Sequence, residues 1–134
     1  MSLTARARLS VLVVDDSHDV RTALRVIIDQ EPLLRVVGAA RTASDAINLF
    51  LHYRPDLVLL AISLPDVSGF RVLDCIKRTY PYTTVILTTK LPNPCVEESG
   101  RLLGATEVCP KTARFDEIRV ALSRFVQMRL PKPG

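Results

Sequence analysis

Short apolar runs alternate with amphipathic segments from one end of the chain to the other. Runs rich in Val, Ile and Leu predict strands at residues 9–14, 35–40, 57–62, 85–87 and 106–109. After each run, apolar residues recur with helical spacing, as at Val20, Leu24 and Ile27. This alternation predicts an α/β domain whose parallel sheet has helices on both faces.

Polar residues mark where several of these helices begin. Ser17 or Asp16 is placed to cap the first helix, and residues 42–45 match a capping box for the second. Asn93 followed by Pro94 predicts the start of a later helix. Residues 57–62 are apolar throughout, which is typical of a central strand that is buried on both faces.

The chain has 134 residues, the length of one domain. We expect a single domain over residues 1–134 with a core at about 9–129; residues 131–134 would be a tail or the start of a truncated linker, and residues 1–3 a cloning leader. No run approaches the roughly 20 apolar residues of a membrane span. The acidic pair after residue 14 argues against a signal peptide, so we expect a cytoplasmic protein.

Composition is globular, with 48% apolar and 24% charged residues. The net charge of +4 arises in the second half, where eleven basic residues face six acidic ones from residue 68 onward. These basic residues are scattered, which indicates a solvated surface and no direct nucleic-acid binding. Cys75, Cys95 and Cys109 lack CxxC spacing, and we expect reduced, partly buried thiols.

Candidate chemistry lies where the predicted strands end. In an open α/β sheet, ligands bind beyond the carboxyl ends of the strands. Asp15 and Asp16 follow the first strand, Thr88 ends the fourth, and Lys111 follows the fifth. Carboxylate oxygens suit Mg²⁺, whereas a hydroxyl and an ammonium suit the oxygens of a phosphoryl group. We therefore expect these side chains to meet in one crevice.

These pieces together resemble the receiver domain of two-component response regulators over essentially the whole chain. The matching segments are residues 13–16, 55–60, 64–69, 87–88 and 104–105, together with Lys111. Residues 31–39, and Lys111 followed by Thr112, are more similar to the receivers of helix-turn-helix transcription regulators. The resemblance implies a doubly wound, flavodoxin-like (βα)5 domain with strand order 2-1-3-4-5.

The resemblance also implies roles for individual residues. Asp15 and Asp16 match the acidic pair that holds Mg²⁺, and Ser63 matches the position whose backbone carbonyl joins the metal. Thr88 matches the switch hydroxyl, and Lys111 the lysine that pairs with the phosphoryl group. The expected partners are a sensor histidine kinase or another signalling protein, or a second copy in a homodimer.

Of the three departures from the family pattern, Thr112 follows Lys111 where a proline is common, and the other two concern the acceptor and the switch. Ala61 stands where such receivers carry the phosphoacceptor aspartate, and a methyl group supplies neither a nucleophile nor a metal ligand. We therefore expect no phosphorylation at the usual site, and Mg²⁺ binding that is weakened or absent. Val108 stands where many members carry Tyr or Phe, so it cannot report the switch as a moving ring. Ser63 and Asp66 lie just beyond Ala61 and are weak substitutes as acceptors.

Alternatives remain open at this point. Ala61 is either natural, in a receiver that works through protein–protein interaction, or an engineered Asp→Ala change in an ordinary receiver of a DNA-binding regulator. A Mg²⁺-dependent phosphohydrolase of the DxD type is a further alternative. Its motif needs a carboxylate two residues after Asp15, where Ser17 stands, and the nucleophile would have to be the adjacent Asp16. The sequence has no nucleophile–base pair and no glycine-rich phosphate loop, so we expect no enzyme.

Overall fold

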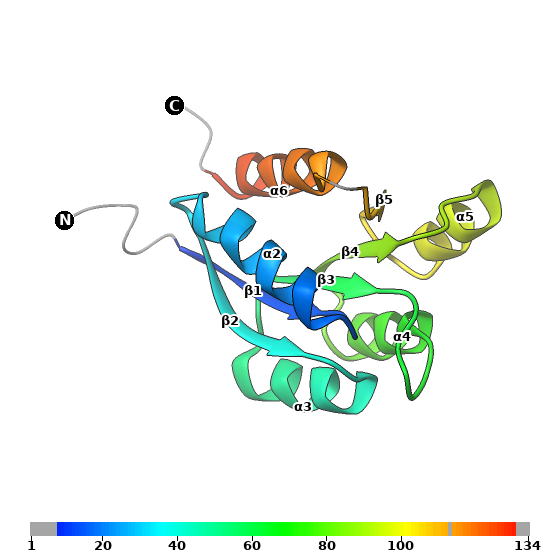
Figure 1. Ribbon diagram of the computed structural model, residues 1–134. Helices are drawn as coiled ribbons and strands as arrows, with labels where there is room; N and C mark the ends of the chain where they lie inside the picture. Colours follow the sequence, from blue (N-terminus) through cyan, green and yellow to red (C-terminus); the bar gives the residue numbers. More distant parts are fainter. Residues whose placement is uncertain (1–7, 113, 131–134) are drawn as a thin grey trace.

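The computed structural model describes residues 8–112 and 114–130, and its strands and helices alternate along the chain (Figure 1). The strands are β1 Leu9–Val14, β2 Leu34–Ala40, β3 Leu57–Ala61, β4 Thr84–Thr89 and β5 Glu107–Pro110. The helices are α2 His18–Asp29, α3 Ala43–Tyr53, α4 Gly69–Thr79, α5 Pro94–Leu102 and α6 Asp116–Arg129. The predicted leader and tail lie outside the described residues.

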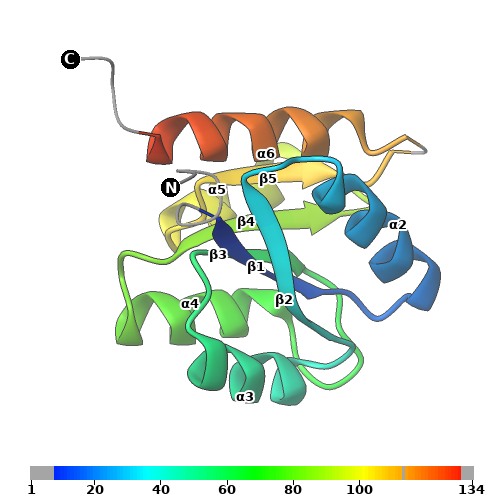
Figure 2. The ribbon, with the colours of Figure 1, turned by 90° about the vertical axis from the view of Figure 1, so that its left-hand side faces the viewer.

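The five strands form one parallel sheet in the order β2-β1-β3-β4-β5. The flavodoxin-like prediction is therefore confirmed. Helices α2 and α6 lie on one face of the sheet, and α3 and α4 lie on the other (Figures 1 and 2). α5 packs on the same face as α3 and α4, because Gly100 of α5 approaches Leu87 of β4.

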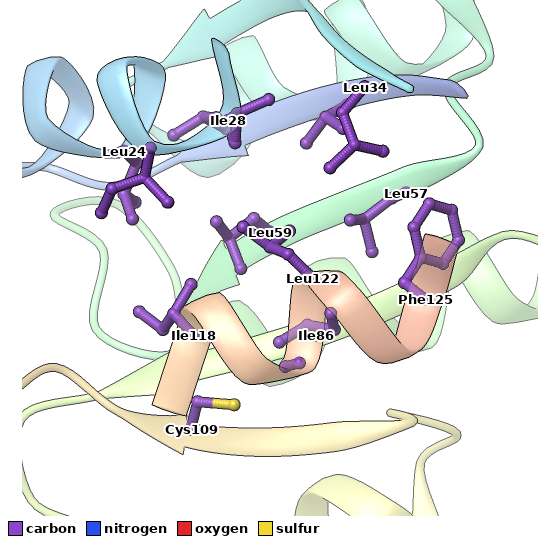
Figure 3. Close-up of a cluster of buried hydrophobic side chains, with 14 of the residues drawn as sticks. Leu24, Ile28, Leu34, Leu57, Leu59, Ile86, Cys109, Ile118, Leu122 and Phe125 are labelled. Carbon is purple, nitrogen blue, oxygen red and sulfur yellow. The ribbon is translucent and has the colours of Figure 1, made fainter. Parts of the chain in front are cut away.

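Alternate residues of the central strands supply two separate cores. In β1, Val11 and Val13 belong to the cluster under α2 and α6, whereas Leu12 and Val14 belong to the cluster under α3 and α4. Figure 3 shows the first cluster, in which Leu59 of β3 lies among side chains of α2 and α6. A strand that is buried on both faces needs apolar residues at nearly every position, which explains the apolar runs at residues 11–14 of β1 and 57–61 of β3.

Helix starts follow the predicted caps. Ser17 Oγ accepts a hydrogen bond from Val20 N, Thr42 Oγ1 accepts one from Asp45 N, and Asn93 Oδ1 accepts one from Val96 N. The third strand ends one residue earlier than predicted, at Ala61. Phe115, which we expected on the apolar face of the last helix, precedes that helix instead, with a left-handed φ of 55°.

Cysteine burial differs from the expectation for two of the three thiols. Cys109 is buried, but Cys75 and Cys95 are exposed, so the prediction of partly buried thiols is wrong for that pair. Both exposed cysteines lie on helices, where the sequence pattern gave no reason to place them outside the core. Among the described residues, no helix is both long enough and apolar enough to cross a membrane.

Candidate functional site

The carboxyl ends of three neighbouring strands bring the predicted polar residues to one edge of the sheet. Asp15 follows β1, Ala61 ends β3, and Thr88 of β4 pairs with Ala61 in the sheet register. Because β3 lies between β1 and β4, the end of β3 is at the middle of this edge. Lys111 follows β5, two strands away from β3, and its backbone N–H donates to Thr89 O.

Asp15 and Lys111 form a buried ion pair. Lys111 Nζ lies 2.6 Å from Asp15 Oδ2, and the two side chains are only 6% and 1% exposed. The other carboxylate oxygen of Asp15, Oδ1, accepts a hydrogen bond from Ser17 N at 2.9 Å. The carboxylate of Asp15 therefore has a local partner at the start of α2 and a distant partner beyond β5.

A cavity of about 210 Å³ opens beside this ion pair, and we call it the strand-end cavity. Its lining includes Asp16, Ser63, Thr88, Lys90, Leu91 and Lys111. Four of these residues were predicted from the sequence: Asp16, Ser63, Thr88 and Lys111. Thr88 is buried, whereas Asp16 and Ser63 are exposed. The structure thus brings these four residues together around one small cavity.

Ala61 is fully buried at the end of β3, and the chain leaves it in a tight turn. Gly69 N donates to Ile62 O at 2.6 Å, which brings the first residue of α4 against the end of β3. A Cβ at position 69 would lie 2.1 Å from the carbonyl oxygen of Ala61, so only glycine fits there. The loop of residues 62–68, which carries Ser63, is folded closely over the strand end.

Asp66 anchors the same loop to α3. Its Oδ1 accepts a hydrogen bond from Ala43 N at 2.9 Å, and its Oδ2 accepts one from Ser44 N at 3.0 Å. These bonds, with the one from Ala43 the stronger influence, lower the pKa of the Asp66 carboxyl below its usual value of 3.8. Asp66 is therefore engaged at a helix N-terminus and does not line the strand-end cavity.

Val108 lies in β5, next to the buried core and away from the cavity lining. It packs with the cluster under α3 and α4, close to Gly100 of α5. A Cβ on Gly100 would come within 2.8 Å of both Val108 Cγ2 and Leu87 Cδ1. The position predicted as a switch residue is thus occupied by an aliphatic side chain in tight contact with a helix.

The donor set around the cavity is a poor fit for Mg²⁺. This ion needs several oxygen ligands in nearly octahedral geometry. Both oxygens of Asp15 already have partners, which leaves the exposed Asp16 as the one uncommitted carboxylate among the described residues that line the cavity. Within residues 8–112 and 114–130, no group of three or more His, Cys, Asp or Glu side chains could hold a metal ion.

Three residues around the site were missed in the sequence. Lys90 and Leu91 line the cavity directly after β4, and reading two residues further past that strand would have found them. Arg21, from α2, donates to the backbone carbonyl of Asp15 at 2.8 Å. Nothing in the local sequence pattern singles out Arg21, because an arginine on a helix is ordinarily solvated.

A larger, shallow groove of about 740 Å³ lies at the opposite ends of the strands. Arg54, Asp56, Tyr80, Tyr82 and Arg129 contribute to its lining. None of the residues predicted for chemistry lies there. We therefore base the functional argument on the smaller cavity, where the predicted side chains converge.

Comparison with known families gives one match that covers most of the chain. Residues 11–123 match the family model described as the response regulator receiver domain. A protein-glutamate methylesterase/protein-glutamine glutaminase of Pyrococcus abyssi is 38% identical over 113 residues, which cover 83% of this chain and 30% of the relative. A protein of Pseudomonas aeruginosa with the same name, numbered 2, is 34% identical and is matched over 91% of this chain and 38% of the relative.

Solved structures give the same picture of the fold. The response regulator domain of Thermotoga maritima CheB superposes with a TM-score of 0.81 at 27% identity, covering 93% of this chain and 98% of that one. The BeF3-activated DrrB receiver domain superposes with a TM-score of 0.78 at 28% identity, covering 89% and 97%.

The expectation of no enzyme is contradicted by the names of the curated relatives. These relatives carry the name of an enzyme, protein-glutamate methylesterase/protein-glutamine glutaminase. The chain spans about a third of their length, between 30% and 38% for these three. The lack of a nucleophile–base pair in this sequence says nothing about a longer protein that carries a receiver as one part.

Proposed function

Since the chain belongs to the response regulator receiver domain family, we propose that it is a signal-transducing receiver in which Ala61 replaces the phosphoacceptor aspartate. The observation that carries this proposal is the place of Ala61. It ends the central strand β3 opposite Thr88, between the strand that leads to Asp15 and the strand that carries the switch hydroxyl. A nucleophilic carboxylate would be needed there, and a methyl group stands in its place.

In this proposal the other residues of the family's phosphorylation site are still in place, and only the acceptor aspartate and the aromatic switch residue are missing. Asp15 and Asp16 are the remaining acidic pair, with the backbone carbonyl of Ser63 as the third metal-facing group. Thr88 and Lys111 are the groups that would contact a phosphoryl oxygen, and Val108 is the position of the missing aromatic switch. The cavity beside Asp16, Ser63, Thr88 and Lys111 supports this assignment.

Without an acceptor, the balance between inactive and active conformations depends on protein partners. A ligand shifts such an equilibrium only through different affinities for the two states. Receiver domains interact with histidine kinases and other signalling proteins, and we propose one of these as the partner of this chain. A homodimer is the alternative arrangement, and we propose no direct contact of this domain with nucleic acid.

Our second proposal is that the signal controls a methylesterase and not a transcription regulator. The observation that favours it is the name shared by relatives that are 34% to 38% identical. The neighbours described as LuxR-family regulators are only 21% to 23% identical, which is evidence for the fold alone. The parent gene would decide this point, and its codon 61 would also decide whether Ala61 is natural or engineered.

Restoring the missing side chain tests the main proposal. We expect Ala61→Asp to gain one phosphoryl group from a small phosphodonor with Mg²⁺, as a hydroxylamine-labile adduct. Ala61→Asn is the matched control, because it has nearly the same shape but no nucleophilic oxygen. A folded Ala61→Asp variant that stays unmodified would count against the roles given to Asp15, Asp16 and Lys111.

A further inference from the structure

The carboxylate of Asp15 is already neutralised inside the protein. Its Oδ2 is buried and lies 2.6 Å from Lys111 Nζ. Apart from this ion pair, Oδ2 has no hydrogen-bond partner among the described residues. Its Oδ1 accepts the N–H of Ser17. One ammonium and one carboxylate thus balance each other with both side chains almost completely removed from solvent.

A divalent cation would have to compete with that ammonium. To reach Asp15 Oδ2, Mg²⁺ would need to displace Lys111 or sit beside it, and two cations a few ångströms apart in a partly buried site repel each other strongly. With an aspartate at position 61, the lysine would have a second carboxylate as partner and Asp15 would be free for a metal. Ala61 removes that option.

We propose that Lys111 is the permanent cation of this site and excludes Mg²⁺ from Asp15. This inference rests on the proposed function, because it uses Ala61 as the cause of the pairing. In this proposal the site has not only lost a metal ligand at position 61, because Lys111 also competes with the metal for Asp15. Removing the lysine should therefore strengthen Mg²⁺ binding, whereas a site that had merely lost a ligand would not improve.

The test is a Mg²⁺ titration of the wild type and of Lys111→Met, followed by the amide chemical shifts of Asp15, Asp16 and Ser17. We expect no saturable response in the wild type at millimolar Mg²⁺. We expect Lys111→Met to bind the ion about tenfold more tightly or better, since a unit charge close to the metal has gone. Mg²⁺ should also raise the melting temperature of Lys111→Met, because a ligand that binds only the folded state stabilises it.

Two further variants complete the design. Arg41→Met removes one positive charge at the end of β2, on the same edge of the sheet and exposed, and should behave as the wild type. Asp15→Asn/Lys111→Met removes both partners and should lose the Mg²⁺ response that the single variant gains. If Arg41→Met gains the same response, general electrostatics explains the effect and the proposal is wrong.

Other outcomes would also overturn the proposal. One is a saturable shift of the Ser17 amide in the wild type at millimolar Mg²⁺, which decides the matter even if Lys111→Met does not fold. The other is a folded Lys111→Met that binds Mg²⁺ no better than the wild type. Either result can occur while the wild type still remains unphosphorylated, so failure of this inference is distinct from failure of the proposed function.

Discussion

Lys111 Nζ lies 2.6 Å from Asp15 Oδ2, and this contact joins the ends of β5 and β1, which are not neighbours in the sheet. The lysine side chain crosses the ends of β3 and β4 to make it. The contact therefore closes the edge of the sheet on which the strand-end cavity lies. It also gives the central strand end, at Ala61, a neighbouring ion pair that carries no net charge.

Removing only one partner of the ion pair should destabilise the folded protein strongly. We expect Lys111→Met to lower the free energy of unfolding by about 3–5 kcal/mol, because it leaves a buried carboxylate without its cation. Asp15→Asn/Lys111→Met should cost less than the sum of the two single changes, since no uncompensated charge remains. Urea unfolding of the four proteins measures the coupling. Strict additivity would mean that the two side chains do not interact.

Asp66 should make stability depend on pH. Hydrogen bonds from the N–H groups of Ala43 and Ser44 lower the pKa of Asp66 in the folded state, so its contribution is fully present above the unfolded value of 3.8. The contribution is lost as the pH falls through the lower, folded pKa. Asp66→Asn should thus be less stable than the wild type at neutral pH, with a difference that shrinks below about pH 4.

The control for Asp66 is a neighbouring cap that carries no charge. Thr42 caps the same helix through Asp45 N, and Thr42→Ala should cost a nearly constant amount, about 1 kcal/mol, at every pH. Thermal or urea unfolding between neutral and acidic pH compares the two variants. An Asp66→Asn penalty that stays constant down to the acid limit would contradict the hydrogen-bond explanation.

Gly69 should tolerate no side chain. Its added Cβ would lie 2.1 Å from Ala61 O, a backbone atom that cannot rotate away, so we expect Gly69→Ala to cost about 2–3 kcal/mol or more. Gly38→Ala is the control: its Cβ would be 3.4 Å from Leu12 Cδ1, and the change should stay within about 1 kcal/mol. Equal losses in the two variants would show that the turn after β3 can relax.

The architecture could be predicted because burial on both faces leaves a clear pattern. Apolar runs at 11–14 and 57–62 correspond to β1 and β3, where every side chain except that of Leu9 is buried. The meeting of Asp16, Thr88 and Lys111 followed from one rule, that parallel strands present their carboxyl ends at the same edge, whereas Ser63 was found only through the family resemblance. The apolar spacing and the capping residues also located α2, α3 and α5.

The pairings within the site could not be predicted. Whether Lys111 reaches Asp15 depends on the twist of four strands and on the length of one side chain, neither of which is written in local spacing. The contact between Asp66 and α3 joins residues 22 and 23 positions apart through the path of a loop. The first prediction for Asp66 placed it near the acceptor position, but its carboxylate is turned to a helix N-terminus instead.

The most direct test of the central claim is the intact mass of the wild-type protein after incubation with acetyl phosphate and Mg²⁺. With Ala61 at the end of β3, the account predicts no change in mass, while Ala61→Asp in the same experiment gains one phosphoryl group. The contradicting result is a wild-type adduct of one phosphoryl group that maps to the strand-end cavity and is released by hydroxylamine.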